Sequence, residues 1–339
     1  MVDESVPGFV FVWFNHRENE RGLPLLWLAE FADLRGWKTL PTLVVLDGIE
    51  RLSFQYRRKL ECSWNLIDQS VQFKQQLSSY PLISSRFSDY EVKCFLRWGI
   101  LAKLHRGRSS HWDGDVVWGD NPDVLTARVA GETFVLQGCP AWTMIGTDQW
   151  FESYARELSS LEKNIDEYSS AAWSEWSDSD LSFHTKWAGT RERPLISSDQ
   201  DLIRHLIHTE RLPQQKPAVI LGKLSEYALF ENPKYVHAYL ADRPLIYQRR
   251  GHEDFFNKKK VALWHFQSDF AGFAFERLLS STQSGSKSRL SSIERWSRKF
   301  FRMKGLDRRT LYQWFFERYD FSLFFSPENF WAPGIFDEN

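Results

Sequence analysis

The chain has 339 residues, with 43 basic and 44 acidic side chains, a near balance that argues against a general nucleic-acid-binding protein. Its length allows one large domain with an appendage, or two domains. Cys62, Cys94 and Cys139 lack the spacing of a metal site, and the sequence shows neither a signal-peptide pattern nor an apolar run of the ~20 residues in a membrane span, so we expect a soluble, cytoplasmic protein with free thiols.

The N-terminal region predicts a strand–helix–strand unit. Residues 9–14 and 42–46 are short apolar runs rich in strand-forming side chains, and residues 24–31 between them have helical spacing. Such a βαβ unit is typical of α/β proteins, whose parallel strands bind ligands outside their carboxyl ends. Asn15 and Asp47 follow the two strands and are therefore candidate nucleotide contacts, although ordinary turn residues would fit the same positions.

The remaining predicted elements follow in order along the chain. Periodicity predicts helices over residues 89–105 and 148–168 and a helix that opens at Ser197–Asp201. Strand patterns cover residues 113–118, 134–140 and 261–266. Residues 169–195 are polar and rich in serine and tryptophan, which predicts a loop.

Asp113 and Asp115 stand one residue apart in the predicted strand 113–118. Two carboxylates held in this way can coordinate a hard divalent cation that bridges a diphosphate, and the metal then neutralises the charge on the leaving group. Asp-x-Asp recurs at 178/180 and 199/201, so the motif alone has little specificity. The apolar residues 116–118 favour the first pair, for which an exposed turn without metal is the alternative.

The character of the chain changes near residue 280. Residues 280–286 have the composition of a linker, so we predict a domain over 1–280 and a helical, basic and aromatic extension over 281–339. Residues 286–310 hold nine basic and two acidic side chains, a net charge of +7, with aromatic residues between them. Such a segment can lie on an anionic membrane surface, which would make the protein peripheral to a membrane, or can dock on the rest of the chain through its rings.

Two later segments add candidate site residues. Asp199, Gln200 and Asp201 open the helix that follows Ser197, and His265 closes the last predicted strand. A histidine nitrogen can join two aspartates around a cation such as Mn²⁺. The alternative for the acidic pair is a helix start, where carboxylates interact favourably with the helix dipole.

In this order the motifs resemble those of the metal-dependent retaining glycosyltransferases of the GT-A fold. The resemblance covers about residues 80–270 and implies a Rossmann-type mixed sheet flanked by helices. The matching positions are Arg97 and Leu101 of the R-x-x-x-L helix, Asp113 and Asp115 of the metal motif, Asp199–Gln200–Asp201 beside the donor sugar, and His265 as the late metal ligand.

The resemblance also implies a chemistry for these residues. Asp115 and His265 would ligate Mn²⁺ or Mg²⁺, and Asp113 would contact the metal, the ribose or the donor sugar. Arg97 would be a fixed cation near the donor, unless it forms only a salt bridge on its own helix. In the catalytic group Asp199, Gln200 and Asp201, Asp199 would hold sugar hydroxyls and Gln200 would face the reacting carbon. A UDP- or GDP-sugar would be the donor, a glycan or glycolipid the acceptor, and the configuration would be retained.

Two other classes of function remain open from the sequence. A carbohydrate-binding or scaffold protein of the same fold would use the many aromatic residues to recognise a glycan or a partner, without metal. A metal-dependent phosphohydrolase would use the same aspartates but needs further carboxylates or histidines near Asp113. His111 is the candidate closest to it in sequence.

Overall fold

The computed structural model describes residues 6–13, 41–52, 54–114, 116–136, 140–176, 195–215, 217–230, 247–250, 253–256 and 259–265. Contacts divide the chain into two units: Met1–Arg21, Thr39–Gly114 and Thr126–Lys223 form unit 1, and Gly22–Lys38, Asp115–Leu125 and Leu224–Asn339 form unit 2. The predicted helix at 24–31, the linker and the extension 281–339 lie outside the described residues. No helix within the described ranges is long and apolar enough to cross a membrane.

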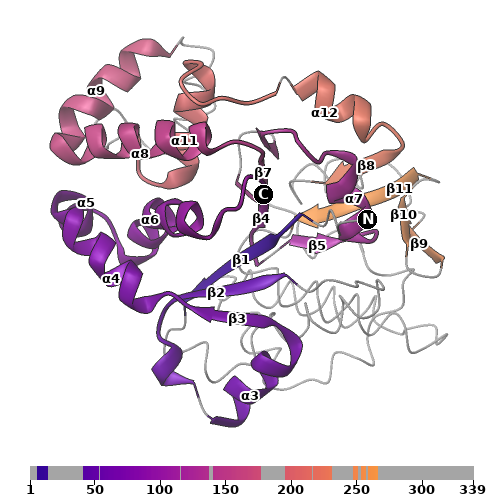
Figure 1. Cartoon of the computed structure of the whole chain (residues 1–339). Coiled ribbons are helices and arrows are strands. Elements are labelled where there is room, and N and C mark those ends of the chain that lie inside the picture. Colours follow the sequence, from indigo (N-terminus) through magenta and orange to yellow (C-terminus); the bar gives the residue numbers. More distant parts are fainter. Residues whose placement is uncertain are drawn as a thin grey trace, which may run out of the picture. The chain divides into compact units, whose positions relative to one another are not determined.

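A six-stranded mixed sheet forms the centre of unit 1 (Figure 1). Its strands are β1 (Gly8–Trp13), β2 (Thr42–Asp47), β3 (Asn65–Asp68), β4 (Ser109–Trp112), β6 (Phe134–Val135) and β7 (Trp142–Ile145), in the order β3-β2-β1-β4-β7-β6. The first four strands pair in parallel, whereas β7 is antiparallel to both β4 and β6. The predicted α/β class with a mixed sheet is therefore confirmed.

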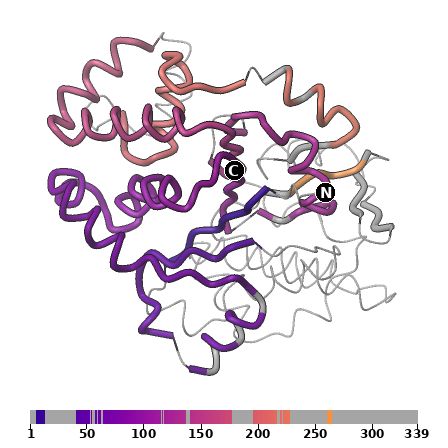
Figure 2. Tube along the Cα trace, viewed as in Figure 1, coloured from indigo at the N-terminus to yellow at the C-terminus, as the bar shows by residue number. Residues whose placement is uncertain are grey.

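Helices complete unit 1, and Figure 2 follows the backbone through them. They are η1 (Ile49–Arg51), α3 (Phe54–Ser63), α4 (Ser70–Ser79), α5 (Pro81–Arg86), α6 (Asp89–Leu104), α8 (Asp148–Lys163), α9 (Ile165–Glu175), α11 (Asp199–His208) and α12 (Pro217–Lys223). α6 is central because it packs against α4, α5, α8 and α11. Its first turn is fixed by a capping box between Ser88 and Glu91, and its apolar residues belong to the main core.

The strand predicted over residues 113–118 begins later in the structure, so its predicted first residue is wrong. β4 ends at Trp112, and β5 (Val116–Trp118) begins only after a turn that contains Asp113 and Gly114. β4 was not predicted, because its residues Ser109, Ser110 and His111 are polar, yet Ser109 and Ser110 are fully buried in it. Their hydroxyls are paired with His105 and with the Trp142 indole, which makes the burial of these polar residues tolerable.

Two more predicted elements differ from the structure. The helix predicted over 148–168 is interrupted at Asn164, whose side chain accepts from the Glu167 amide and caps α9. The loop predicted from 169 begins later, since α9 continues to Glu175. The strand predicted over 134–140 is confined to Phe134–Val135 within the described residues.

Unit 2 contains a second sheet, in which β11 (Lys259–His265) is the central described strand. It pairs with β5, with β8 (Tyr227–Phe230) and with β10 (Glu253–Phe256), which in turn pairs with β9 (Tyr247–Arg250). The chain passes from unit 2 to unit 1 within α7 (Pro122–Arg128), between Leu125 and Thr126. β11 confirms the late strand predicted around residues 261–266.

The C-terminal end of α11 is a tight turn with an unfavourable residue at its key position. The Arg211 amide donates to Leu206 at 2.8 Å and the Glu210 amide donates to Ile207 at 3.2 Å, the two bonds of a Schellman motif. Glu210 has a φ of 56°, in the left-handed region, where glycine is preferred because it lacks a Cβ.

Glu210→Gly is therefore expected to raise the free energy of unfolding by about 0.5–1 kcal/mol, because it relieves the left-handed strain. Chemical denaturation of both proteins measures the change. Glu210→Ala is the control, since it removes the carboxylate from the negative end of the helix dipole but keeps the Cβ. An equal gain in the alanine variant would show that charge, and not backbone strain, is the cause.

Candidate functional site

The candidate site lies at the carboxyl ends of the parallel strands of unit 1. β1 ends at Trp13 and β2 at Asp47, which are paired in register, and Asp113 follows the end of β4. The chain passes from β1 to β2 and β3 on one side, whereas β4 pairs on the other side of β1. Ligands in open α/β sheets bind outside the strand ends at such a change of direction, here between β1 and β4.

A buried arginine joins three elements at this position. Arg97 projects from α6, and its Nη1 donates to Asp113 Oδ1 at 2.6 Å. Its Nε donates to Oδ2 of Asp199, the first residue of α11, at 2.8 Å, and its Nη2 lies 2.7 Å from the same oxygen. The Trp98 indole also donates to Asp199 Oδ2, at 2.8 Å. The alternative in which Arg97 pairs only along its own helix is therefore wrong.

The charges in this cluster are strongly coupled. Burial alone would lower the pKa of Arg97, but the Asp113 and Asp199 carboxylates raise it well above its ordinary value, so the guanidinium stays protonated. Burial raises the pKa of Asp199, against the opposing effect of Arg97. Because Arg97 and the Trp98 indole can only donate, the carboxylate form of Asp199 suits this arrangement. Removing one partner would leave an uncompensated buried charge.

His111 lies next to the arginine cluster, with its Nε2 3.8 Å from Asp113 Oδ1. Its ring is fully buried and contacts the rings of Phe11 and Trp98, with centroid distances of 5.2 Å and 4.9 Å. Burial and the neighbouring Arg97 lower its pKa to about 3, so the imidazole is neutral. A fully buried ring whose pKa is this low is a weak base, so His111 is poorly suited to accept a proton from water in the phosphohydrolase that the sequence left open.

A second group of side chains surrounds the ends of β1 and β2. The rings of Trp13 and Tyr90 meet edge to face at 5.2 Å. The Lys93 ammonium lies 6.0 Å from the centroid of the Trp13 ring and 3.4 Å from Asp47. Tyr90, Lys93 and Arg97 are spaced at i, i+3 and i+7 on α6, so one helix carries both this group and the arginine cluster.

Asp201 has a different position from Asp199. Ser198 is the N-cap of α11, and its hydroxyl accepts from the Asp201 amide. The Asp201 carboxylate accepts from the backbone and the hydroxyl of Ser197, at 3.0 Å and 2.7 Å. Asp201 thus stabilises the first turn of α11, which agrees with the alternative that the acidic pair marks a helix start. Asp199 points into the arginine cluster instead. Gln200 lies between them and is partly exposed.

The structure thus brings together Arg97, Asp113 and Asp199, three residues that the sequence singled out from separate motifs. Asn15 and Asp115 lie outside the described residues, and only the backbone of His265 is described, paired with Val116 in unit 2. No group of three or more histidine, cysteine, aspartate or glutamate side chains in the described part of the chain could hold a metal ion. The metal ligands Asp113, Asp115 and His265 therefore remain predictions.

Sequence reasoning missed Trp13, Tyr90, Lys93 and Trp98. A signal for two of them was available, because Tyr90 and Lys93 share a helical face with Arg97. Trp98 gave none, since a tryptophan in an apolar helix is most often core, and this one is fully buried. Its role in the cluster comes from the single polar atom of its indole.

Comparisons with known proteins give structural similarity only. No protein-family model matches the chain, and no curated protein matches it. It is similar to mouse xyloside xylosyltransferase 1 in its apo form (11% identity, 78% of this chain and 98% of that chain, TM-score 0.39). It is also similar to the galactosyltransferase LgtC in complex with donor and acceptor sugar analogs (14% identity, 77% of this chain and 87% of that chain, TM-score 0.36). An active-site mutant of LgtC gives 13% identity over 83% of this chain and 98% of that chain, with a TM-score of 0.35. At these identities and TM-scores the likeness assigns neither an activity nor a residue role to the chain.

Two buried histidines predict how stability depends on pH. Burial lowers the pKa of His111 to about 3 and that of His205, in α11, to about 4. An unfolded histidine titrates near 6.5, so below that pH the unfolded chain binds protons that the folded chain excludes. Stability should therefore fall as the pH drops from about 6.5 to 4.5, by about 2–5 kcal/mol.

Urea denaturation of the whole chain between pH 7.5 and 4.5 measures this loss. His205→Gln is expected to reduce the slope below pH 6.5 by about one proton, since glutamine does not titrate. A slope that is the same in the variant and the parent would contradict the assignment of His205 as a neutral buried group.

Proposed function

We propose that the chain is a glycosyltransferase that moves a sugar from a nucleotide-diphosphate donor to a glycan or glycolipid acceptor. The observation that supports it best is the Arg97 cluster, which holds Asp113 and Asp199 together at the carboxyl ends of the parallel strands. Rigid carboxylates at such a site can accept hydrogen bonds from the hydroxyls of a sugar. Their fixed orientation also reduces the entropy lost when the donor binds.

The nucleoside of the donor would lie against the second group of side chains. Trp13 and Tyr90 offer aromatic surface, and Tyr90 is 59% exposed. Asp47 and Lys93 supply an acceptor and a donor next to these rings, which suits the polar edge of a base or a ribose. In this proposal Asp47 would contact the nucleotide, as the sequence suggested, and Asn15 is a further candidate.

Asp199 would hold the transferred sugar. Its Oδ2 is engaged by Arg97 and Trp98, and among the described residues none donates to Oδ1. That oxygen is therefore the one offered to sugar hydroxyls. Gln200 would face the reacting carbon, and Asp201 would keep the start of α11 in place. We propose retention of configuration by attack on the front face, with a UDP- or GDP-sugar as donor.

A divalent cation, Mn²⁺ or Mg²⁺, would be held by Asp113 together with Asp115 and His265. Asp113 fits this role, since its side chain is 26% exposed and its Oδ2 receives no hydrogen bond from the part of the chain that the structure describes. Carboxylate oxygens are the ligands that hard cations prefer. When bound, the cation would supply charge neutralisation for the departing diphosphate.

Metal-dependent nucleotide binding is the first test of this function. Calorimetry with UDP and GDP should show binding with Mn²⁺ or Mg²⁺, and much weaker binding in excess chelator, because the diphosphate would be held mainly through the cation. Asp115→Ala should remove the metal dependence while the melting temperature changes little. Equal affinity with and without metal would argue against the proposed metal site.

Asp199→Asn tests the role of the cluster in sugar transfer. Loss of the negative charge should lower turnover of the nucleotide sugar by at least tenfold, while the affinity for free nucleotide stays nearly unchanged, because the nucleotide lacks the sugar. A fall in stability is also expected, since Arg97 loses a buried partner.

Ser197→Ala is the matched control for Asp199→Asn, because it weakens the same helix start without touching Arg97. Turnover and calorimetric affinity should be measured for both variants under conditions where each is folded. If both variants lose turnover to the same extent, the effect arises from helix stability, and the proposed contact with the sugar is wrong.

A further inference from the structure

α11 is fixed at its two ends by separate arginines. At its start, Arg97 holds Asp199, and at its end Arg211 follows the Schellman turn. The ten residues of α11 span about 15 Å. Its apolar face, formed by Leu202, Ile203 and Leu206, is fully buried in the main core. A helix of ten residues has about three turns, so a tilt at one end displaces the side chains at the other end.

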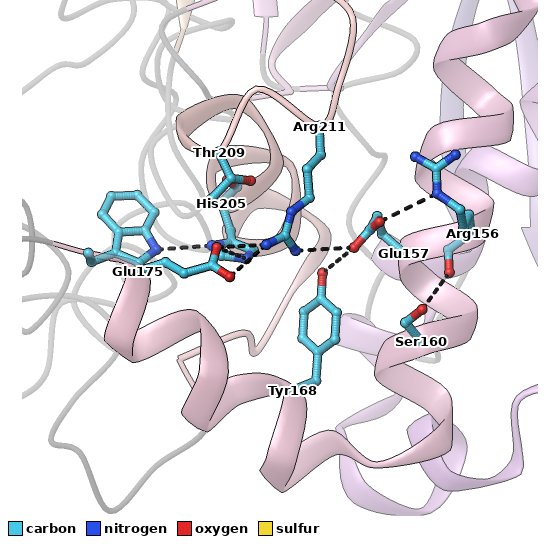
Figure 3. A network of polar contacts seen from close by, with 9 residues as sticks. Arg156, Glu157, Ser160, Tyr168, Glu175, His205, Thr209 and Arg211 are labelled. Carbon is cyan, nitrogen blue, oxygen red and sulfur yellow. Dashed lines mark hydrogen bonds and ion pairs between the residues drawn. The ribbon is translucent and has the colours of Figure 1, made fainter.

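Arg211 binds two other helices (Figure 3). Its Nη2 donates to both carboxylate oxygens of Glu175, at the end of α9, with distances of 2.6 Å and 2.8 Å. Its Nη1 lies 3.5 Å from Glu157 in α8, and the Tyr168 hydroxyl donates to the same glutamate oxygen at 2.9 Å. Both contacts with Glu175 come from one guanidinium nitrogen, and such charge-assisted hydrogen bonds are stronger than neutral ones.

His205 completes this contact from within α11. The Trp176 indole donates to His205 Nδ1 at 3.1 Å, which places the imidazole proton on Nε2. Nε2 faces Glu175 at 3.7 Å, so Glu175 is approached by Arg211 and His205 together. The C-terminal half of α11 is thus held to α9 through one carboxylate.

We propose that Arg211 is a positioning residue that, through α11, sets the place of Asp199 in the arginine cluster. The expected effect on turnover rests on the proposed function, whereas the expected displacement of Asp199 does not depend on it. The core contacts of Leu202 and Leu206 lie between the two arginines, so release of the C-terminal end lets the helix tilt about them. The Asp199 carboxylate then shifts relative to Arg97 and Trp98.

The Trp98 indole proton reports this shift directly, because among the described residues its acceptor is Asp199 Oδ2 alone. In ¹H–¹⁵N spectra of the full chain, Arg211→Met should shift or broaden the Trp98 indole signal, which Trp98→Phe assigns. The Trp142 indole, which donates to Ser110 at 3.1 Å in the sheet, is the internal control and should stay in place. Arg211→Lys keeps one charged contact and should give a smaller shift.

Arg156→Met is the matched control variant. Arg156 also faces Glu157, at 3.5 Å, but its side chain is 63% exposed and it belongs to α8, so it should leave the Trp98 signal unchanged. If Arg211→Met does not fold, Arg211→Lys carries the same test, together with Tyr168→Phe, which removes the hydroxyl that donates to Glu157. An unchanged Trp98 signal in a folded Arg211 variant, or equal shifts of Trp98 and Trp142, would overturn the proposal.

Turnover separates this proposal from the proposed function. If the chain transfers sugar, Arg211→Met should lower kcat at least tenfold while KM for the donor changes less than threefold, and Arg211→Lys should restore part of kcat. A chain with no transferase activity but a displaced Trp98 signal would disprove the function and leave the coupling intact. Full activity with an undisplaced Trp98 signal would support the function and disprove the coupling.

Discussion

The burial of one guanidinium constrains the rest of unit 1. Arg97 is 5% exposed, and an arginine cannot lose its charge in a protein, so its burial requires nearby carboxylates in good geometry. Asp113 and Asp199 meet this requirement from two elements that are distant in sequence. The turn after β4 and the start of α11 are therefore tied to α6. Replacing the cluster with apolar side chains could preserve stability, which makes function the better reason for its presence.

The fold could be predicted where apolar patterns are plain. β1, β2, α6, α11 and β11 follow from runs and periodicity in the sequence. β4 could not, because Ser109, Ser110 and His111 are polar residues whose burial depends on partners from elsewhere in the fold. The break at Asn164 was also missed, because the helical pattern of apolar residues continues across it. An asparagine in such a pattern can point to solvent or cap a new helix, and only the fold shows that Asn164 caps α9.

The candidate site was predicted as a set of residues but not as an arrangement. Order along the chain selected Arg97, Asp113 and Asp199, yet only the fold shows that one arginine contacts both aspartates. The sequence placed Asp199 and Asp201 in one catalytic group, in which only Asp199 was expected to hold sugar hydroxyls. Tertiary contacts separate them, because Asp201 faces its own helix start and Asp199 faces Arg97. The Trp13–Tyr90 pair was missed since its members lie on different elements.

The crowding of donors on one oxygen of Asp199 also bears on reactivity. Three nitrogens lie within 2.8 Å of Oδ2, and hydrogen bonds to a carboxylate stabilise its negative charge. Burial acts in the opposite direction and raises the pKa of Asp199, so the three donors oppose that rise and favour the charged carboxylate. An ester formed at Oδ1 would remove the negative charge that these donors stabilise and would leave the buried Arg97 with one carboxylate partner fewer. In the proposed transfer, Asp199 is therefore suited to orienting the sugar through hydrogen bonds and not to forming a covalent bond with it.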